Sequence, residues 1–229
     1  MRFEGVLFDL DGTLLDTVPD LAAATNAMLL ELGYDPLPQP TIASYVGKGA
    51  ENLIHRSLTG QMDGQVSSDL FHKAMPIWKR CYTEANGLHT EIYPGVLEGL
   101  DLLRDAGLPL GVVTNKPEEF ALPLLSATGL SGYFQVIVGG DTCSQKKPQP
   151  MPVFHACNEL EINPERTLFI GDSLNDAQAA RAAACICWLL PYGYNEGNPV
   201  SGVPCDRFVQ SIEEAALQLL NMQSKDLKS

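Results

Sequence analysis

Short apolar runs alternate with stretches of helical spacing along most of this chain, and this alternation constrains the fold more than any other feature. Continuous apolar runs are typical of parallel strands that helices cover on both faces. The runs that fit such strands are residues 6–8, 110–113, 136–138, 167–170 and 186–190. The stretches of helical spacing between them include residues 96–106, 118–128, 152–160 and 175–184. This order predicts an α/β fold with a doubly wound parallel sheet, a Rossmann-like core.

The stretch from about Pro19 to Asn86 breaks this alternation, because it has helical patterns and no convincing strand. Its helices are expected between Thr17 and Gly33, at residues 49–58 and at residues 68–82, with a stiff loop through Pro36, Pro38 and Pro40. We therefore predict an inserted all-α cap at residues 16–87 and a discontinuous catalytic core made of residues 1–15 and 88–229. The tail after about Met222 is polar and expected to fray.

The residues that follow the predicted strands are polar in a consistent way. In an open parallel sheet, ligands bind at the carboxyl ends of the strands, where the strand order reverses. The segments that would meet at this edge are residues 9–13, 114–116, 146–148 and 171–176. They bring several carboxylates, a hydroxyl, an amide and a lysine together. The sequence thus predicts a polar site at one edge of the sheet.

These residue types favour phosphoryl transfer assisted by Mg²⁺. Carboxylates that lie close together are costly to ionise unless a cation joins them, and Mg²⁺ prefers hard oxygen ligands. No histidine or cysteine occurs in these segments, which argues against zinc. A hydroxyl and a lysine are available to phosphate oxygens. One carboxylate can then act as the nucleophile, and a second can protonate the leaving oxygen.

Four ordered motifs resemble those of the haloacid dehalogenase superfamily. They are DLDGTL at residues 9–14, Thr114-Asn115, Lys147-Pro148 and GDSLND at residues 171–176. Their spacing is similar to that of the subclass with a helical cap between the first two motifs. The resemblance implies a magnesium-dependent phosphate monoester hydrolase that acts through an aspartyl-phosphate. Members that dehalogenate lack the second aspartate of the first motif, and Asp11 is present here, so phosphate hydrolysis is favoured over dehalogenation.

The same resemblance implies a role for each matching residue. Asp9 is expected to be the nucleophile and a metal ligand, and Asp11 the general acid/base that offers its backbone carbonyl to the metal. Asp172 is expected to be a further metal ligand. The residues expected to hold the transferred phosphoryl group are Thr114, Asn115 and Lys147. The residues expected to support the site are Gly12, Ser173 and Asp176, the last as a ligand through water or by orienting Lys147.

Further segments resemble bacterial phosphoglycolate phosphatases, and these are residues 15–21, 46–53, 93–96 and 147–150. This resemblance implies 2-phosphoglycolate as the substrate, with its carboxylate near Gly47 and Lys48 of the cap. A small polar residue is expected more often at the position of Lys48, so another anionic substrate stays open. The alternatives are a phosphatase for a sugar phosphate or a nucleotide, a sugar phosphomutase, and a non-catalytic phosphate-binding module.

The net charge of −13 argues against a nucleic-acid partner, which needs clustered lysine and arginine. The richest later apolar segment, residues 182–190, is too short to cross a bilayer, and the N-terminal segment lacks the features of a signal peptide. The cysteines occur without a CxxC pair and are expected to be reduced. We therefore expect a cytoplasmic monomer or homodimer whose partner is a small phosphorylated metabolite, with no membrane and no nucleic acid.

Overall fold

The computed structural model describes residues 3–226, and within them a parallel sheet has the strand order β5-β4-β1-β6-β7-β8. The strands are β1 (Gly5–Phe8), β4 (Leu110–Val113), β5 (Val136–Val138), β6 (Thr167–Gly171), β7 (Ile186–Leu189) and β8 (Arg207–Phe208). Leu7 of β1 lies opposite Gly111 of β4 and Phe169 of β6. The order of the strands reverses beside β1, so its carboxyl end lies at the switch point of a doubly wound sheet. The fold class predicted from the sequence is confirmed.

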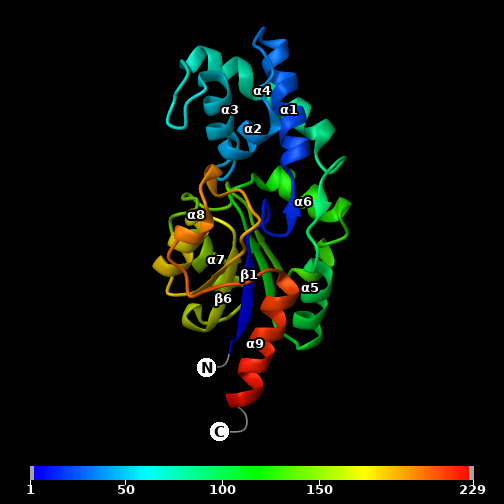
Figure 1. Ribbon diagram of the computed structural model, residues 1–229, viewed down its shortest axis with the longest axis vertical. Coiled ribbons are helices and arrows are strands. Elements are labelled where there is room, and N and C mark those ends of the chain that lie inside the picture. The colour runs from blue at the N-terminus through cyan, green and yellow to red at the C-terminus, as the bar shows by residue number, and fades with distance from the viewer. Residues whose placement is uncertain (1–2, 227–229) are drawn as a thin grey trace.

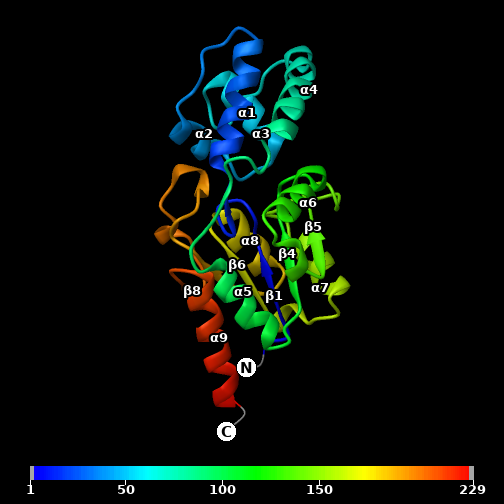
Figure 2. The same cartoon turned by 90° about the vertical axis from the view of Figure 1, so that its right-hand side faces the viewer.

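Helices cover both faces of the sheet (Figure 1, Figure 2). On one face they are α5 (Val96–Asp105), α6 (Glu118–Ala127) and α9 (Ile212–Asp226), and on the other α7 (Met151–Glu159) and α8 (Leu174–Ala182). Val6 and Phe8 pack in the buried cluster of the first face, whereas Leu7 packs in that of the second. Because neighbouring side chains of a strand point to opposite faces, a strand covered on both sides must be apolar throughout. This requirement explains the uninterrupted run before Asp9.

A layer of helices lies above the carboxyl ends of the strands, as Figure 1 shows. We call it the helical layer, and its members are α1 (Val18–Glu31), α2 (Gln39–Tyr45), α3 (Ala50–Thr59) and α4 (Ser68–Ala85). These helices pack around a separate buried cluster that includes Met28, Ile54 and Trp78. Next to it, β2 (Leu15–Asp16) pairs antiparallel with β3 (Glu91–Ile92). The expected helical content of this region is observed, whereas the boundaries of the predicted cap at residues 16 and 87 stay a prediction.

Local structure differs from expectation at two places. Pro40, expected in a stiff loop, lies in the first turn of α2. Backbone N–H groups in a first turn have no partner within the helix, so a proline there costs no hydrogen bond. The tail after Met222, expected to fray, continues α9 to Asp226, and Gln223 Nε2 donates a hydrogen bond of 3.0 Å to the carbonyl of Phe3. Its last residues, 227–229, lie outside the described part of the chain. Among residues 3–226, no helix has the length and apolar character needed to cross a membrane.

Candidate active site

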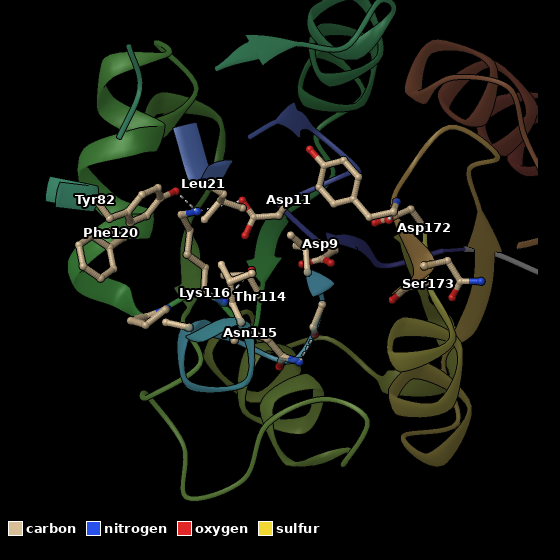
Figure 3. Close-up of a pocket in the computed structure, with 18 of the residues that line it drawn as sticks. Asp9, Asp11, Leu21, Tyr82, Thr114, Asn115, Lys116, Phe120, Asp172 and Ser173 are labelled. Carbon is tan, nitrogen blue, oxygen red and sulfur yellow. Dashed lines mark hydrogen bonds and ion pairs between the residues drawn. The ribbon is translucent and has the colours of Figure 1, made fainter. Parts of the chain in front are cut away.

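Asp9 and Asp11 directly follow β1, at the carboxyl edge of the sheet (Figure 3). The backbone N–H of Asp9 donates a hydrogen bond of 3.0 Å to the carbonyl of Ile170, which continues the ladder between β1 and β6. The Oδ1 atom of Asp9 lies 2.8 Å from the donating N–H of Leu10 and 2.8 Å from Lys147 Nζ. The other oxygen, Oδ2, has no partner in the described part of the chain and is therefore available to a ligand.

Lys147 is buried between two carboxylates. Its Nζ lies 2.8 Å from Asp9 Oδ1 and 2.6 Å from Asp176 Oδ1, and its side chain is 1% exposed. Burial alone would lower the pKa of Lys147, but the carboxylates of Asp176 and Asp9 outweigh burial and raise the pKa above its ordinary value. Lys147 therefore stays protonated and can hold an anionic group beside Asp9.

The N-terminus of α8 fixes Asp176. Ser173 caps this helix in a capping box, in which Asp176 Oδ2 accepts hydrogen bonds from the Ser173 N–H at 3.0 Å and from its hydroxyl at 2.6 Å. Asp176 is fully buried and aims its other oxygen at Lys147. Burial first, and then the charge of Asp176, raise the pKa of Asp9 well above its ordinary range. The capping residue Asp176 thus adds to the effect of burial on the pKa of Asp9.

Asp172 follows β6 and is held from two sides. Its Oδ1 accepts a hydrogen bond from Thr13 Oγ1 at 2.7 Å, and its Oδ2 accepts one from the N–H of Tyr194 at 2.8 Å. Burial and then the neighbouring Asp176 raise the pKa of Asp172 to about 7. Gly12 adopts a φ of +85°, and a Cβ added there would lie 2.6 Å from Asp172 Oδ2. Glycine is therefore required at residue 12, both for its backbone conformation and for room beside Asp172.

The carboxylates of Asp9, Asp172 and Asp176 together offer a place for a cation. One oxygen of each lies within 4.8 Å of the others, and carboxylates this close repel one another unless a cation joins them. Asp176 is already neutralised by the Lys147 ammonium and accepts three hydrogen bonds at Oδ2. Each oxygen of Asp172 accepts a single hydrogen bond from an uncharged donor, and Asp9 keeps Oδ2 free, so Asp9 and Asp172 are the better ligands. Carboxylate oxygens without histidine or cysteine suit a hard divalent cation.

Thr114 and Asn115 follow β4 and are buried at the same edge. Asn115 Nδ2 donates hydrogen bonds of 2.9 Å to the carbonyls of Gly47 and Lys147. Its Oδ1 is buried and has no hydrogen-bond partner among residues 3–226. Asn115 thus connects the loop of Lys147 to the loop between α2 and α3, and it keeps one polar atom for a ligand or a water molecule.

The sequence profile of the haloacid dehalogenase-like hydrolases matches residues 6–189, a range that holds all of these carboxylates and both of the residues after β4. This chain belongs to the haloacid dehalogenase-like hydrolase family. It is 55% identical to the phosphoglycolate phosphatase of Nitrosospira multiformis over 94% of this chain and 95% of that protein. It is 46% identical to the phosphoglycolate phosphatase of Thiobacillus denitrificans over 96% of each chain.

Solved structures of family members have the same fold. A predicted phosphoglycolate phosphatase from Haemophilus somnus has a TM-score of 0.89 and 31% identity, over 96% of this chain and 99% of that one. The protein CbbY from Rhodobacter sphaeroides, solved in complex with phosphate, has a TM-score of 0.78 and 26% identity, over 95% of this chain and 100% of that one. The family and the reaction class predicted from the motifs are confirmed: the protein is a phosphoric monoester hydrolase.

Lys116 has no role in the sequence-based prediction, although it directly follows the Thr114-Asn115 motif. Its Nζ donates a hydrogen bond of 3.0 Å to Asp11 Oδ1 and another to the hydroxyl of Tyr82 in α4. Thr17 Oγ1 donates to the same Asp11 oxygen at 2.7 Å. Burial alone would lower the pKa of Lys116, but Asp11 and Tyr82 outweigh burial and raise it above its ordinary value. In this family member, a second buried lysine thus accompanies the second aspartate of the first motif.

Tyr194 is a further residue that the motifs do not reveal. Its N–H holds Asp172, while its hydroxyl donates to Asp16 Oδ1 at 2.8 Å and accepts from the N–H of Thr17 at 2.8 Å. Tyr194 therefore connects a candidate metal ligand to the residue that caps α1. No sequence motif signals this role, because it depends on a contact between residues far apart in the chain.

The pocket above Asp9 and Asp11 has an apolar wall, part of which Figure 3 shows. The apolar residues that line it include Leu21, Leu53 and Trp78 of the helical layer, Val46 in the loop after α2, and Phe120 of α6. Gly47 also lines the pocket, whereas Lys48 is not among the described residues that line it. Lys48 Nζ lies 3.5 Å from Glu196 Oε2, and its side chain is 40% exposed. Contact between Lys48 and a substrate stays a prediction.

Proposed function

We propose that this enzyme hydrolyses 2-phosphoglycolate to glycolate and phosphate, in a magnesium-dependent reaction that passes through an aspartyl-phosphate on Asp9. The observation that carries the proposal is the meeting of Asp9, which has a free oxygen, with Lys147 and Asp172 at the edge of the sheet. The choice of substrate is supported by relatives named phosphoglycolate phosphatase at 55% and 46% identity.

In the first step, Asp9 attacks the phosphorus atom while Lys147 holds the phosphoryl oxygens. The bond between phosphorus and the Asp9 oxygen forms as the bond between phosphorus and the glycolate oxygen breaks. Asp11 gives its proton to that leaving oxygen. The Thr114 hydroxyl and the Asn115 side chain lie at the same edge and complete the phosphoryl site.

Asp9 and Asp172 are the side chains that would hold Mg²⁺, together with the backbone carbonyl of Asp11. When bound, the ion supplies positive charge beside the transferred phosphoryl group. Asp176 and Ser173 keep Lys147 and the end of β6 in place, and Gly12 leaves room for Asp172. These supporting residues act on the reaction through the groups they hold.

In the second step, Asp11 takes a proton from a water molecule that attacks the phosphorus atom of the aspartyl-phosphate. The bond between phosphorus and Asp9 breaks, phosphate leaves, and the Asp9 carboxylate is restored. We propose that the helical layer closes over the pocket for the first step and opens to admit this water. The hydrogen bond from Asn115 Nδ2 to the Gly47 carbonyl is one of the contacts that such an opening would break.

The decisive measurement is phosphate release from a panel of monoesters, with Mg²⁺ and with a chelator. The panel contains 2-phosphoglycolate, hexose phosphates, nucleoside monophosphates and an aryl phosphate. Wild type is compared with Asp9→Asn and with Asp35→Asn, whose side chain is exposed and is not among the described residues that line the pocket. We expect release that needs Mg²⁺, favours 2-phosphoglycolate, is lost by at least about 10⁴-fold in Asp9→Asn and is unchanged in Asp35→Asn.

The alternatives predicted from the sequence give different results in the same assay. Preference for a sugar phosphate or a nucleotide would keep the chemistry and overturn the substrate. Isomerisation of a sugar phosphate without net phosphate release would indicate a phosphomutase, and binding without turnover a phosphate-binding module. The partner proposed here is a small phosphorylated metabolite, while the cytoplasmic location and the choice between monomer and homodimer stay predictions.

A further inference from the structure

Lys116 is the only lysine or arginine among the described residues that line the pocket. Two further cations of the helical layer and its loops, Arg56 and Lys48, are engaged elsewhere. Arg56 is buried, donates to the carbonyls of Met62 and Tyr45, and pairs with Glu196 at 2.6 Å. Lys48 pairs with the same Glu196. Among the described side chains that line the pocket, a negatively charged group that enters it beyond the phosphoryl site therefore has a single cation to meet.

The ammonium group of Lys116 has a free donor. A lysine carries three N–H donors, and in the described part of the chain Nζ has two hydrogen-bond partners, Asp11 Oδ1 and the Tyr82 hydroxyl. Figure 3 shows Lys116 between Tyr82 and the aspartates, with its amino group beside the pocket. The Tyr82 hydroxyl accepts from Lys116 and keeps its own O–H to donate, but the cation is the stronger partner for an anion. One donor on a buried cation is thus available to a ligand.

The position of Lys116 favours a contact with the leaving group over a contact with the phosphoryl group. Lys147 accompanies Asp9, the nucleophile, whereas Lys116 accompanies Asp11, which in the proposed reaction meets the leaving oxygen. In 2-phosphoglycolate one methylene separates that oxygen from the carboxylate, so the carboxylate lies just beyond Asp11. The wall around it is apolar, and an anion buried there without a cation is strongly disfavoured. Lys116 is placed to offset the free-energy cost of burying this carboxylate.

We propose that Lys116, held by Tyr82, binds the carboxylate of the leaving group and so makes the enzyme selective for phosphate monoesters with a carboxylate next to the ester carbon. This inference rests on the proposed function and names the residue that would give it its substrate preference. In this proposal the carboxylate is recognised by Lys116 in the loop after β4, with Tyr82 of α4 as support, and a contact with Lys48 is not needed. Tyr82 acts by positioning Lys116, while Lys116 contacts the substrate.

The test compares kcat/KM for 2-phosphoglycolate with kcat/KM for ethyl phosphate, in which a methyl group replaces the carboxylate. The ratio of the two values isolates the carboxylate, because loss of the Lys116 contact to Asp11 affects both substrates. We expect Lys116→Met to lower the ratio by at least about 10-fold, the size of a charged hydrogen bond. Tyr82→Phe should lower it by about two- to fivefold. Lys73→Met, on the exposed face of α4, should leave the ratio unchanged.

An equal loss for both substrates in Lys116→Met overturns the inference and leaves Lys116 as a residue that positions Asp11 alone. Lys116→Arg keeps the charge and should retain most of the ratio, which a role in folding alone does not predict. If Lys116→Met does not fold, as judged by circular dichroism, Tyr82→Phe and Lys116→Arg decide the question by the same ratio. A wild-type ratio near one overturns the proposed substrate itself, whereas a high wild-type ratio that survives Lys116→Met overturns only the present inference.

Discussion

Two buried lysines meet the two aspartates that follow β1, and their surroundings differ. Lys147 lies between Asp9, in the loop after β1, and Asp176, in the first turn of α8, and both carboxylates are at the edge of the sheet. Lys116 lies between Asp11 and Tyr82, and Tyr82 belongs to α4 of the helical layer. The first set is therefore complete within the α/β part, whereas the second is assembled from both layers of the molecule.

This difference separates chemistry from selectivity. A phosphoryl site built on strand ends keeps its geometry when the helical layer moves, because none of its charged members comes from that layer. The site of the leaving group changes with the position of α4 and with the side chains that α4 presents. We infer that substitutions beside Lys147 should affect all substrates alike, whereas substitutions beside Lys116 should distinguish one substrate from another.

The largest effect is expected from Lys147→Met. Removal of this cation leaves Asp9 and Asp176 buried and close together without a partner, so we expect a loss of about 3–5 kcal/mol in the free energy of unfolding of the metal-free protein. We also expect kcat/KM to fall by at least about 10³-fold for every substrate. Urea unfolding and phosphate release measure the two effects. Lys146→Met, at the neighbouring position, is the matched control, and equal stability of the two variants would contradict the assigned role of Lys147.

The next effect concerns pH and the metal. The pKa of Asp172 is raised to about 7, by burial first and then by Asp176, and the pKa of Asp9 is raised in the same direction. Between about pH 4 and pH 7 the unfolded chain releases protons that the folded metal-free protein keeps, so its free energy of unfolding should fall as pH rises. The raised pKa of Lys147 acts only in the alkaline range, above the ordinary lysine value.

Urea unfolding at pH 5 and pH 7.5, with a chelator and with Mg²⁺, measures this dependence. Mg²⁺ should stabilise the protein more at pH 7.5, where the carboxylates are free to bind it. Asp172→Asn should reduce the loss of stability with pH, while Tyr82→Phe should leave it unchanged, because Tyr82 lies at the other set. An identical gain from Mg²⁺ at both values of pH would argue against a metal on these carboxylates.

The set around Lys147 could be predicted from the sequence, and so could the fold. Continuous apolar runs identify buried parallel strands, and polar residues after those runs must meet at one edge whatever the details of packing. Asp9, Asp172 and Lys147 each belong to a loop that directly follows a strand or lies beside one, so their convergence needs no knowledge of the helical layer. The order of the four motifs, through its resemblance to the family, then indicates the class of reaction.

The set around Lys116 could not be predicted in the same way. Its second partner, Tyr82, reads in the sequence as one more aromatic residue on an amphipathic helix, and nothing there states which way it faces. Strands of two residues, such as β2 and β3, are likewise too short to leave a pattern. Lys48 illustrates the opposite case, since its sequence context favours a substrate contact while its observed partner, Glu196, lies in a distant loop.

The smallest effect is therefore expected from Lys48→Ala. The ion pair between Lys48 and Glu196 is partly exposed, so its loss should cost at most about 1 kcal/mol of stability. We expect kcat/KM for 2-phosphoglycolate to change by less than about threefold, and the ratio to ethyl phosphate to stay constant. Glu196→Gln should be more harmful, because it also leaves the buried Arg56 without its carboxylate. If Lys48→Ala lowered the ratio as much as Lys116→Met, selectivity would depend on the loop after α2 as well. Lys48 would then have to be added to the comparison between the set around Lys147 and the set around Lys116.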